Sequence, residues 1–474
     1  MRYLAVLLFL ALLIKDTVPL GETLILRGIF ENLALFTGLA WLLLFGTAEM
    51  CKRYLLLIAY LVVLLLTMFV WYEPLWVGLQ VVSLAAVVVF FIAFVESTRD
   101  APQAHDKIFQ WTAYALIIVC IGSLVLYRLY PSLAIELVES EYSPNGPPRF
   151  KGLFGKPGMM ATASGILLGF CLFARLNIFV RILGILSAFP CLFLTLSRTF
   201  WAAAIGAVGV VAFFYLRKSR VYFGAAIALL VLSSLLGTVL DIKLSSNASE
   251  RIVRQESLTN FSGRTFVWSL ALEKFWNSPL LGFGYTLGHH ALLEFRGGKV
   301  VEDRSSNISL FKNKKFSLHN GYMQALLDSG VIGGILYVLI MAVVPWKLFA
   351  YDKERRYGAA MYCILFFSIS NGGESTVLAA AMFHSVFYWY LAAIAFSLPY
   401  YVHEAQVVEP VSQETGFNSI VSRPRLLSTA PPQWQIGNPD EMGTPTLTTK
   451  NSVANACDSR PQLDRQTAQV ARGH

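Results

Sequence analysis

Residues 319–346, HNGYMQALLDSGVIGGILYVLIMAVVPW, decide the fold class of this chain. The segment is apolar along most of its length, and it exceeds the roughly 20 helical residues that cross the hydrocarbon core of a bilayer. It nevertheless opens with the polar pair His319-Asn320 and carries Asp328. Titratable groups near one end of a predicted membrane helix indicate that this end has a role beyond crossing the membrane.

The composition extends this interpretation to most of the chain. Of the 474 residues, 56% are hydrophobic and 14% are charged. A soluble domain could not bury so much apolar surface in one core, so we take lipid to be the solvent for most of the chain. We predict an all-α polytopic membrane protein with about twelve transmembrane helices. The predicted helices span residues 3–20, 27–46, 54–72, 74–95, 109–130, 157–175, 178–195, 199–216, 221–240, 319–346, 357–371 and 375–400.

Lysine and arginine residues gather in alternate short connections between these helices. The basic residues are Lys52, Arg53, Arg99, Lys107, Arg175, Arg181, Arg217, Lys218, Arg220, Lys347, Lys353, Arg355 and Arg356. By the positive-inside rule these connections face the cytoplasm, which places both termini there and the loops 131–156 and 241–318 on the outer face. The net charge of +9 is scattered in short clusters between apolar runs, so it indicates topology and not nucleic-acid binding.

The composition changes after residue 401. Residues 402–474 are rich in Pro, Ser, Thr and Gln and cannot bury enough apolar surface to offset chain entropy. We predict a transmembrane domain over residues 1–401 and a disordered cytoplasmic tail over 402–474, which offers a place for a cytoplasmic partner. The six cysteines have neither a disulfide framework nor metal-ligand spacing, so we expect no metal and no cofactor.

The outer loop contains one informative stretch, SGRTFVWSLALEKFWNSPLLGFGY, at residues 262–285. Ser262 is a suitable cap for a helix from Arg264 to Trp276, and Pro279 ends it. Its aromatic face, which comprises Trp268, Leu272, Phe275 and Trp276, is typical of a helix lying on the membrane surface. Gly282 and Gly284 then predict a tight turn, because glycine allows close backbone approach.

Three groups from distant parts of the sequence face the same side in this topology. Arg198 lies at the outer boundary between the seventh and eighth predicted helices, Arg264 opens the surface helix, and His319 opens the tenth membrane helix. Two guanidinium groups suit a diphosphate, since each donates a planar fork of hydrogen bonds and stays charged. A neutral histidine beside them can take a proton from a hydroxyl group. The pattern predicts a site for a lipid diphosphate and an alcohol.

Each of these residues also has a structural interpretation. Arg198 can simply extend to the membrane interface, and Arg264 can be a surface charge on an amphipathic helix. The His319-Asn320 pair can serve only as a helix cap. Asp328 fits a structural hydrogen-bonding role better than a catalytic one.

A second basic group comes from the other outer loop. Lys156, in RFKGLFGKPG (149–158), can attract an anionic headgroup or belong to a flexible basic loop.

The sequence resembles the O-antigen ligase and polymerase superfamily of bacterial membrane glycosyltransferases. The resemblance rests on His319-Asn320 followed at fixed spacing by Gly330 and Gly333, on SRT at 197–199, and on GRTFVW…NSPLLGFGY before the His-Asn pair. It implies a metal-independent, GT-C-like enzyme of the bacterial inner membrane. Such an enzyme takes a glycan from undecaprenyl diphosphate on the periplasmic face and passes it to a hydroxyl group.

By this resemblance Arg198 and Arg264 bind the diphosphate, and His319 acts as the base or orients the acceptor. The single sizeable outer loop favours a ligase, with lipid A core as acceptor, over an O-antigen or exopolysaccharide polymerase, whose acceptor is another glycan. A polysaccharide flippase is a more remote alternative, because the predicted helices carry few charges. The sugar, the acceptor and the oligomeric state are not predicted.

Overall fold

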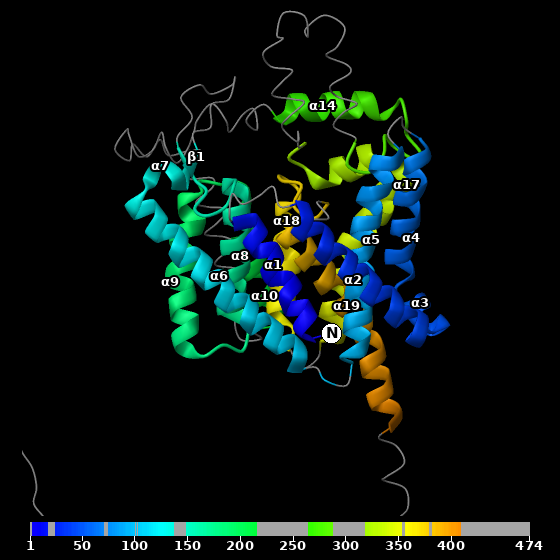
Figure 1. The fold of residues 1–474 in the computed structure, drawn as a ribbon, viewed down its shortest axis with the longest axis horizontal. Coiled ribbons are helices and arrows are strands. Elements are labelled where there is room, and N and C mark those ends of the chain that lie inside the picture. The colour runs from blue at the N-terminus through cyan, green and yellow to red at the C-terminus, as the bar shows by residue number, and fades with distance from the viewer. Residues whose placement is uncertain are drawn as a thin grey trace, which may run out of the picture. The chain divides into compact units, whose positions relative to one another are not determined.

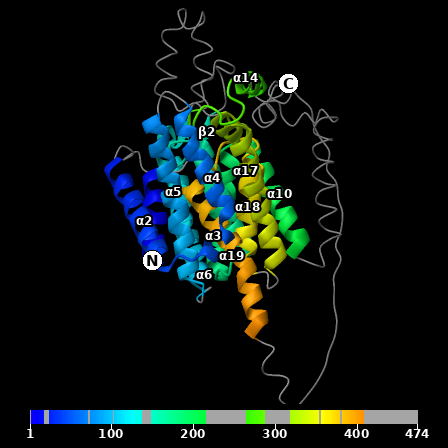
Figure 2. The same ribbon diagram turned by 90° about the vertical axis from the view of Figure 1, so that its right-hand side faces the viewer.

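The structure is a computed structural model that describes residues 2–17, 24–70, 74–99, 101, 103–136, 148–215, 264–287, 318–352, 356–378 and 382–408. It is a bundle of long helices running up and down, shown in two views in Figures 1 and 2. Helices predominate because a helix satisfies its own backbone hydrogen bonds, as a segment in lipid must. The first half of the chain contributes α1 (Arg2–Thr17), α2 (Leu24–Phe45), α3 (Ala48–Arg53), α4 (Leu55–Leu66), α5 (Pro74–Ser97) and α6 (Gln103–Leu129).

The rest of the chain completes the bundle and covers one end of it. The remaining long helices are α8 (Pro157–Phe173), α9 (Ile178–Leu194), α10 (Arg198–Tyr215), α17 (Gly321–Tyr351), α18 (Gly358–Ser370) and α19 (Phe383–Val408). The short elements are the 3-10 helix η1 (Thr67–Phe69), α7 (Pro131–Ala134) and an antiparallel pair of strands, β1 (Ile135–Glu136) and β2 (Arg149–Phe150). Helix α14 (Arg264–Phe275) lies across one end (Figure 1), which we call the α14 end; the opposite end, which contains α3, is the α3 end.

The predicted membrane helices correspond closely to these elements. Each predicted segment overlaps a helix of the structure except 221–240, which lies outside the described residues. Among the described residues, three helices are long and apolar enough to cross a membrane, namely Val77–Ser97, Gln103–Leu129 and Gly321–Tyr351, and seven shorter apolar helices accompany them. The helical membrane fold is therefore supported, whereas the total of about twelve spans stays a prediction.

The last predicted helix, 375–400, begins later than the sequence indicates. Helix α19 starts at Phe383, and residues 376–378, within the predicted helix, are buried and non-helical. Ser385 donates a hydrogen bond from its hydroxyl to the carbonyl of Val377, and Phe383 N–H donates to Asp16 Oδ2 at 2.8 Å. These contacts hold Val377 and the start of α19 in place.

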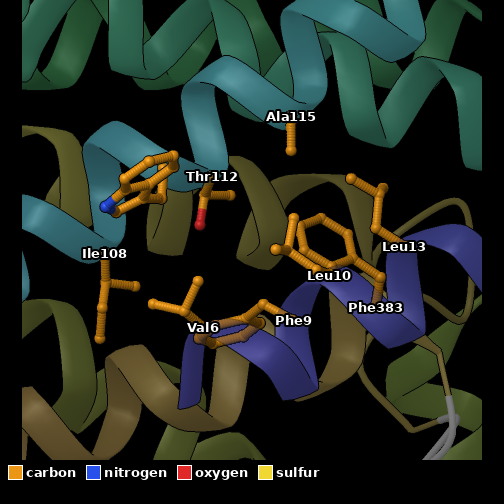
Figure 3. A pocket seen from close by; sticks show the side chains of 9 residues that line it. Val6, Phe9, Leu10, Leu13, Ile108, Thr112, Ala115 and Phe383 are labelled. Carbon is orange, nitrogen blue, oxygen red and sulfur yellow. The ribbon is translucent and has the colours of Figure 1, made fainter. Parts of the chain in front are cut away.

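The interior is packed with aromatic rings. Phe9 of α1 lies 5.3 Å from Phe91 of α5 and 5.6 Å from Phe387 of α19, measured between ring centroids. A hollow between α1 and α6, lined by Thr112 and otherwise by apolar side chains (Figure 3), holds about 10 Å³, no more than a single water molecule needs. The outer surface is apolar too: Leu43 is 86% exposed and Phe179 is 78% exposed, as expected for side chains that face lipid.

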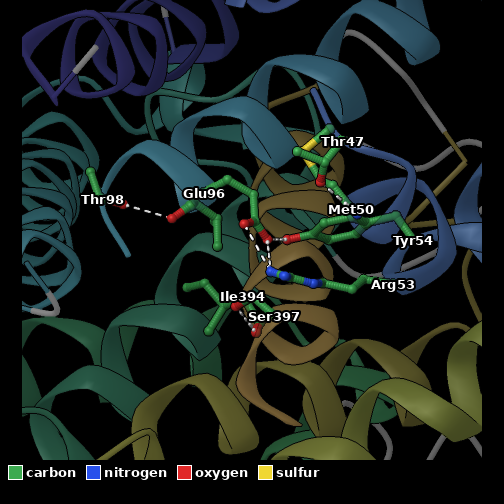
Figure 4. A network of polar contacts seen from close by, with 9 residues as sticks. Thr47, Met50, Arg53, Tyr54, Glu96, Thr98, Ile394 and Ser397 are labelled. Carbon is green, nitrogen blue, oxygen red and sulfur yellow. Dashed lines mark hydrogen bonds and ion pairs between the residues drawn. The ribbon is translucent and has the colours of Figure 1, made fainter. Parts of the chain in front are cut away.

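The α3 end is held together by ion pairs. Arg53 Nη1 lies 3.1 Å from Glu96 Oε2, and Tyr54 donates its hydroxyl to Glu96 Oε1 at 2.9 Å (Figure 4). Arg356 Nη2 lies 2.7 Å from Asp106 Oδ2, which joins the start of α6 to the chain before α18. Basic residues that the sequence assigned to cytoplasmic connections therefore also join helices.

Candidate functional site

His319 lies directly before α17 at the α14 end, in an unusual backbone conformation. Its φ is +50°, in the left-handed region that residues other than glycine seldom adopt. The next residue, Asn320, caps the helix: its Oδ1 accepts hydrogen bonds from the N–H groups of Tyr322 and Met323, each at 3.1 Å. The geometry assigns the capping role to Asn320 and leaves the imidazole of His319, with 48% of its side chain exposed, for other contacts.

The imidazole of His319 contacts a carboxylate that the sequence analysis did not single out. His319 Nδ1 lies 2.7 Å from Oε2 of Glu374, in the turn that follows α18. Glu374 belongs to the stretch NGGE at residues 371–374, in a short connection between two predicted helices. An acidic residue in an otherwise uncharged connection was the available signal, but the sequence does not show which group it meets.

The turn at 371–374 joins the site to α17. Gly321 N–H donates to the carbonyl of Asn371 at 2.8 Å, and a Cβ atom on Gly321 would lie 2.0 Å from Asn371 Oδ1. Asn371 Nδ2 in turn donates to the hydroxyl of Tyr337 at 2.9 Å. The close approach that Gly321 permits therefore holds the start of α17 against the turn that carries Glu374.

The same turn reaches the start of α10, where Arg198 is the first helical residue. A Cβ atom on Gly373 would lie 2.6 Å from Cγ2 of Thr199, the neighbour of Arg198. Arg198, partly exposed, thus begins its helix beside the turn whose Glu374 contacts His319. The structure brings these two predicted site residues to the same end of the bundle, through a turn that lies between them.

Arg264 reaches this end through α14, of which it is the first residue. One turn later, about 6 Å along the helix axis, Trp268 donates its indole N–H to the carbonyl of Leu318 at 2.9 Å. Leu318 directly precedes His319. The helix that begins with Arg264 is therefore attached to the residue before the imidazole.

The aromatic face predicted for this helix divides in the structure. Ala271 and Phe275 are buried in a small apolar cluster with Leu327 of α17, whereas Leu272 and Trp276 are exposed. The helix thus uses one side to pack on α17 and keeps apolar side chains on another, which fits a helix at a membrane surface.

Two glycines of the predicted motif make a reciprocal backbone contact. Gly330, with φ +67° and ψ −168°, interrupts α17, and Gly282 has φ +69°. A Cβ atom on Gly330 would lie 2.2 Å from the carbonyl of Leu280, and one on Gly282 would lie 2.6 Å from the backbone N of Gly330. Both positions require glycine, because the loop after α14 presses directly on the break in α17.

The loop also takes over the hydrogen bonds that the break in α17 leaves unmade. Phe283 N–H donates to the carbonyl of Leu327 at 3.0 Å, Gly284 N–H donates to that of Asp328 at 2.9 Å, and Val331 N–H donates to that of Pro279 at 2.7 Å. The break is therefore satisfied by backbone partners, as a buried chain requires. Gly282 and Gly330 therefore have structural roles.

The other two glycines illustrate the same point. Gly284 has φ +104°, a backbone conformation that favours glycine. A Cβ atom on Gly333 would lie 2.1 Å from Ser329 Oγ. That hydroxyl donates a hydrogen bond to the carbonyl of Ala325 at 2.6 Å. Gly333 therefore leaves room for a serine one turn earlier on α17.

Asp328 is 1% exposed and lies behind the site. Its Oδ2 accepts a hydrogen bond from Thr286 N–H at 3.1 Å, and its Oδ1 accepts one from Gln324 Nε2 at 2.7 Å. Burial, with a smaller contribution from the Asp328 carboxylate, raises the pKa of the Tyr285 phenol. The phenol stays protonated and donates to the carbonyl of Leu378. Asp328 therefore organises the loop at 282–287, in keeping with the structural interpretation.

Lys156 is exposed and precedes the first helical residue of α8. A Cβ atom on Gly158, two residues later, would lie 3.7 Å from the ring of Phe200 in α10, which places Lys156 at the α14 end. Within the described ranges, no hydrogen bond or ion pair between Lys156 and His319, Arg198 or Glu374 is found. Residues 241–263 and 288–317 of the outer loop lie outside the described part of the chain.

Residues 182–338 match the O-antigen ligase family model. The match confirms the resemblance to the O-antigen ligase and polymerase superfamily and supports a membrane enzyme of ligase or polymerase type. It covers about a third of the chain, including Arg198, Arg264 and His319, and it ends before Glu374. A search of curated proteins found no match.

Proposed function

We propose that this protein is an inner-membrane glycosyltransferase that moves a glycan from undecaprenyl diphosphate to an acceptor hydroxyl at the periplasmic face. The observation that carries the proposal is the meeting of three elements at the α14 end. The starts of α10 and α17 are joined through the 371–374 turn, and α14 is attached at Leu318. Arg198, His319 and Arg264 are the residues at these positions, and all three lie within the region that matches the O-antigen ligase family.

The chemistry follows from the charges at these positions. The acceptor hydroxyl gives its proton to Nε2 of neutral His319 while its oxygen bonds to the anomeric carbon of the donor sugar. The bond from that carbon to the diphosphate oxygen breaks, and the electron pair leaves with undecaprenyl diphosphate. Fixed guanidinium groups at Arg198 and Arg264 stabilise the charge that develops on the leaving group more than the ground state. Direct displacement of this kind inverts the anomeric configuration.

The acceptor separates the two members of the superfamily that fit this chemistry. A ligase transfers to the lipid A core, and a polymerase transfers to a second lipid-linked glycan. We infer ligase activity from the single sizeable outer loop of the sequence, 241–318, against the short loop 131–156. The same assay tests both, because both release undecaprenyl diphosphate.

The decisive experiment uses the full-length protein purified in lipid nanodiscs, with an undecaprenyl-diphosphate-linked O-antigen repeat as donor and lipid A core as added acceptor. Release of undecaprenyl diphosphate reports turnover, and binding of undecaprenyl diphosphate alone reports the diphosphate site. His319→Ala should lower turnover by about 10²–10⁴-fold, the usual contribution of a general base, with binding unchanged. Arg198→Ala and Arg264→Ala should weaken binding and turnover together.

Arg128→Ala is the matched control, because Arg128 is an exposed arginine in the last turn of α6 at the same end. It should leave binding and turnover at the wild-type level. Full turnover by both His319→Ala and Arg264→Ala would eliminate the mechanism. Glycan on lipid A core identifies a ligase, and longer glycans on the carrier in place of that product identify a polymerase.

A further inference from the structure

Glu374, which contacts His319, has no role in the mechanism proposed above. We propose that Glu374 is a positioning residue that fixes the tautomer of His319 and offsets the positive charge formed on the imidazole during glycan transfer. This inference rests on the proposed function and assigns a role to a residue outside the region that matches the family. Its basis is the 2.7 Å distance between His319 Nδ1 and Glu374 Oε2.

The position of Glu374 is set by the end of α18. Glu374 N–H donates to the carbonyl of Ser370 at 2.9 Å, and Gly373 N–H donates to the same carbonyl at 3.0 Å. A carboxylate at the C-terminal end of a helix is disfavoured by the helix dipole. A neighbouring proton donor offsets that cost, and the imidazole N–H of His319 supplies one. The 21% exposure of the Glu374 side chain keeps this contact partly shielded from water.

The backbone of His319 is held on both sides. The carbonyl of Leu318 accepts the indole N–H of Trp268, and Asn320 caps α17. Between these anchors His319 keeps its positive φ, a conformation that persists where the surroundings impose it and that gathers at functional sites. The carboxylate of Glu374 then fixes the ring, so that backbone and side chain are both constrained.

The contact determines which ring nitrogen is available for chemistry. A carboxylate only accepts hydrogen bonds, so the proton of neutral His319 resides on Nδ1. Nε2 therefore carries the lone pair and takes the proton of the acceptor hydroxyl. The imidazolium formed in that step stays beside the Glu374 carboxylate, which stabilises it, and it later returns the proton to water. Carboxylates placed behind histidines act in this way in other enzymes.

The test compares Glu374→Gln and Glu374→Asp with wild type, in the nanodisc assay with the undecaprenyl-diphosphate-linked donor. Glutamine keeps the size of the side chain but removes its charge and can donate to Nδ1, which would favour the wrong tautomer. We expect Glu374→Gln to lower kcat by about 10–100-fold, with KM for the donor within about twofold and with an unchanged melting temperature. Glu374→Asp should recover part of kcat, because the carboxylate is retained.

The control is Glu273→Gln, since Glu273 is an exposed glutamate on α14 at the same end; it should leave kcat unchanged. A wild-type kcat in Glu374→Gln, with His319→Ala inactive, overturns the positioning role and leaves the proposed function standing. If the fall in kcat of Glu374→Gln is explained by a lowered melting temperature, the positioning role is also overturned, because Glu374 is then a structural residue. Full activity of His319→Ala would instead remove the proposed function itself.

Discussion

The two ends of the helix bundle hold their ion pairs in different settings. At the α3 end, Arg53 and Glu96 have side chains that are 10% and 8% exposed, and the pair also accepts the hydroxyl of Tyr54. Arg356 and Asp106 repeat the arrangement between two other segments. Each pair joins a guanidinium group to a carboxylate, mostly shielded from water, and connects one segment of the bundle to another.

At the α14 end the corresponding pair consists of a titratable imidazole and a carboxylate. His319 is 48% exposed, in contrast to the shielded arginines of the α3 end. An exposed imidazole can take part in proton transfer, whereas a shielded guanidinium group mainly holds segments together. The ion pairs at the α3 end therefore join helices, whereas the pair at the α14 end leaves its imidazole accessible.

We expect the clearest difference in a cysteine-labelling experiment that tests whether the two ends face opposite sides of the membrane. Cys51, in α3, is an exposed free cysteine, and Glu273→Cys would introduce one on α14. In a Cys457→Ser background, a membrane-impermeant maleimide should label Glu273→Cys in intact cells. It should label Cys51 only after the inner membrane is permeabilised. Labelling of both positions in intact cells would contradict the predicted topology.

The second prediction concerns the contact of Gly330 with the loop after α14. Gly330→Val would drive a side chain into the carbonyl of Leu280 and strain a positive φ. We expect destabilisation of more than about 4 kcal/mol, in the range that only a few mechanisms reach, seen as loss of monodisperse protein. Gly155→Ala is the control, because open space surrounds Gly155 at the same end. A stable Gly330→Val protein would show that the loop can move away.

The third prediction separates stability from catalysis at the α3 end. Arg53→Ala leaves the shielded Glu96 carboxylate without its guanidinium and should destabilise the protein by about 3 kcal/mol. The turnover of the protein that remains folded should equal that of wild type. The double variant Arg53→Leu/Glu96→Leu should regain most of the melting temperature. A specific loss of kcat in Arg53→Ala would break the distinction between the two ends.

The smallest effect is expected for Trp268→Phe, which removes one hydrogen bond at the α14 end. Phenylalanine keeps the ring but leaves the carbonyl of Leu318 without the indole N–H, at a cost of about 1 kcal/mol. The melting temperature should fall slightly, and kcat should fall several-fold because the backbone beside His319 is loosened. If activity falls only in proportion to the loss of folded protein, the hydrogen bond from Trp268 to Leu318 does not help to orient the imidazole.

The sequence predicted the features that depend on local pattern. Runs of apolar residues marked the helices because lipid requires them, and alternation along the chain then placed Arg198, Arg264 and His319 at one end. The capping role of Asn320 was also accessible, since asparagine before a helix is a common cap. Each of these depends on neighbouring residues or on the order of segments.

The remaining features depend on contacts between distant segments. Glu374 meets His319 across 55 positions of sequence, and nothing near either residue encodes that pairing. Gly282 and Gly330 fit each other only because the loop and the break in α17 press together. The late start of α19 has the same origin, because the contacts of Ser385 with Val377 and of Phe383 with Asp16 join residues of different segments.

The break at Gly330 divides α17 into two helical parts of unequal length. The short part, residues 321–329, packs on α14 through Leu327 and Phe275, and its first residue, Gly321, donates a hydrogen bond to Asn371 of the turn after α18. The same turn contacts Thr199, the neighbour of Arg198. The 279–284 loop hydrogen-bonds to residues on both sides of the break, so Gly330 forms a rigid bend that fixes where His319 stands relative to the starts of α10 and α14.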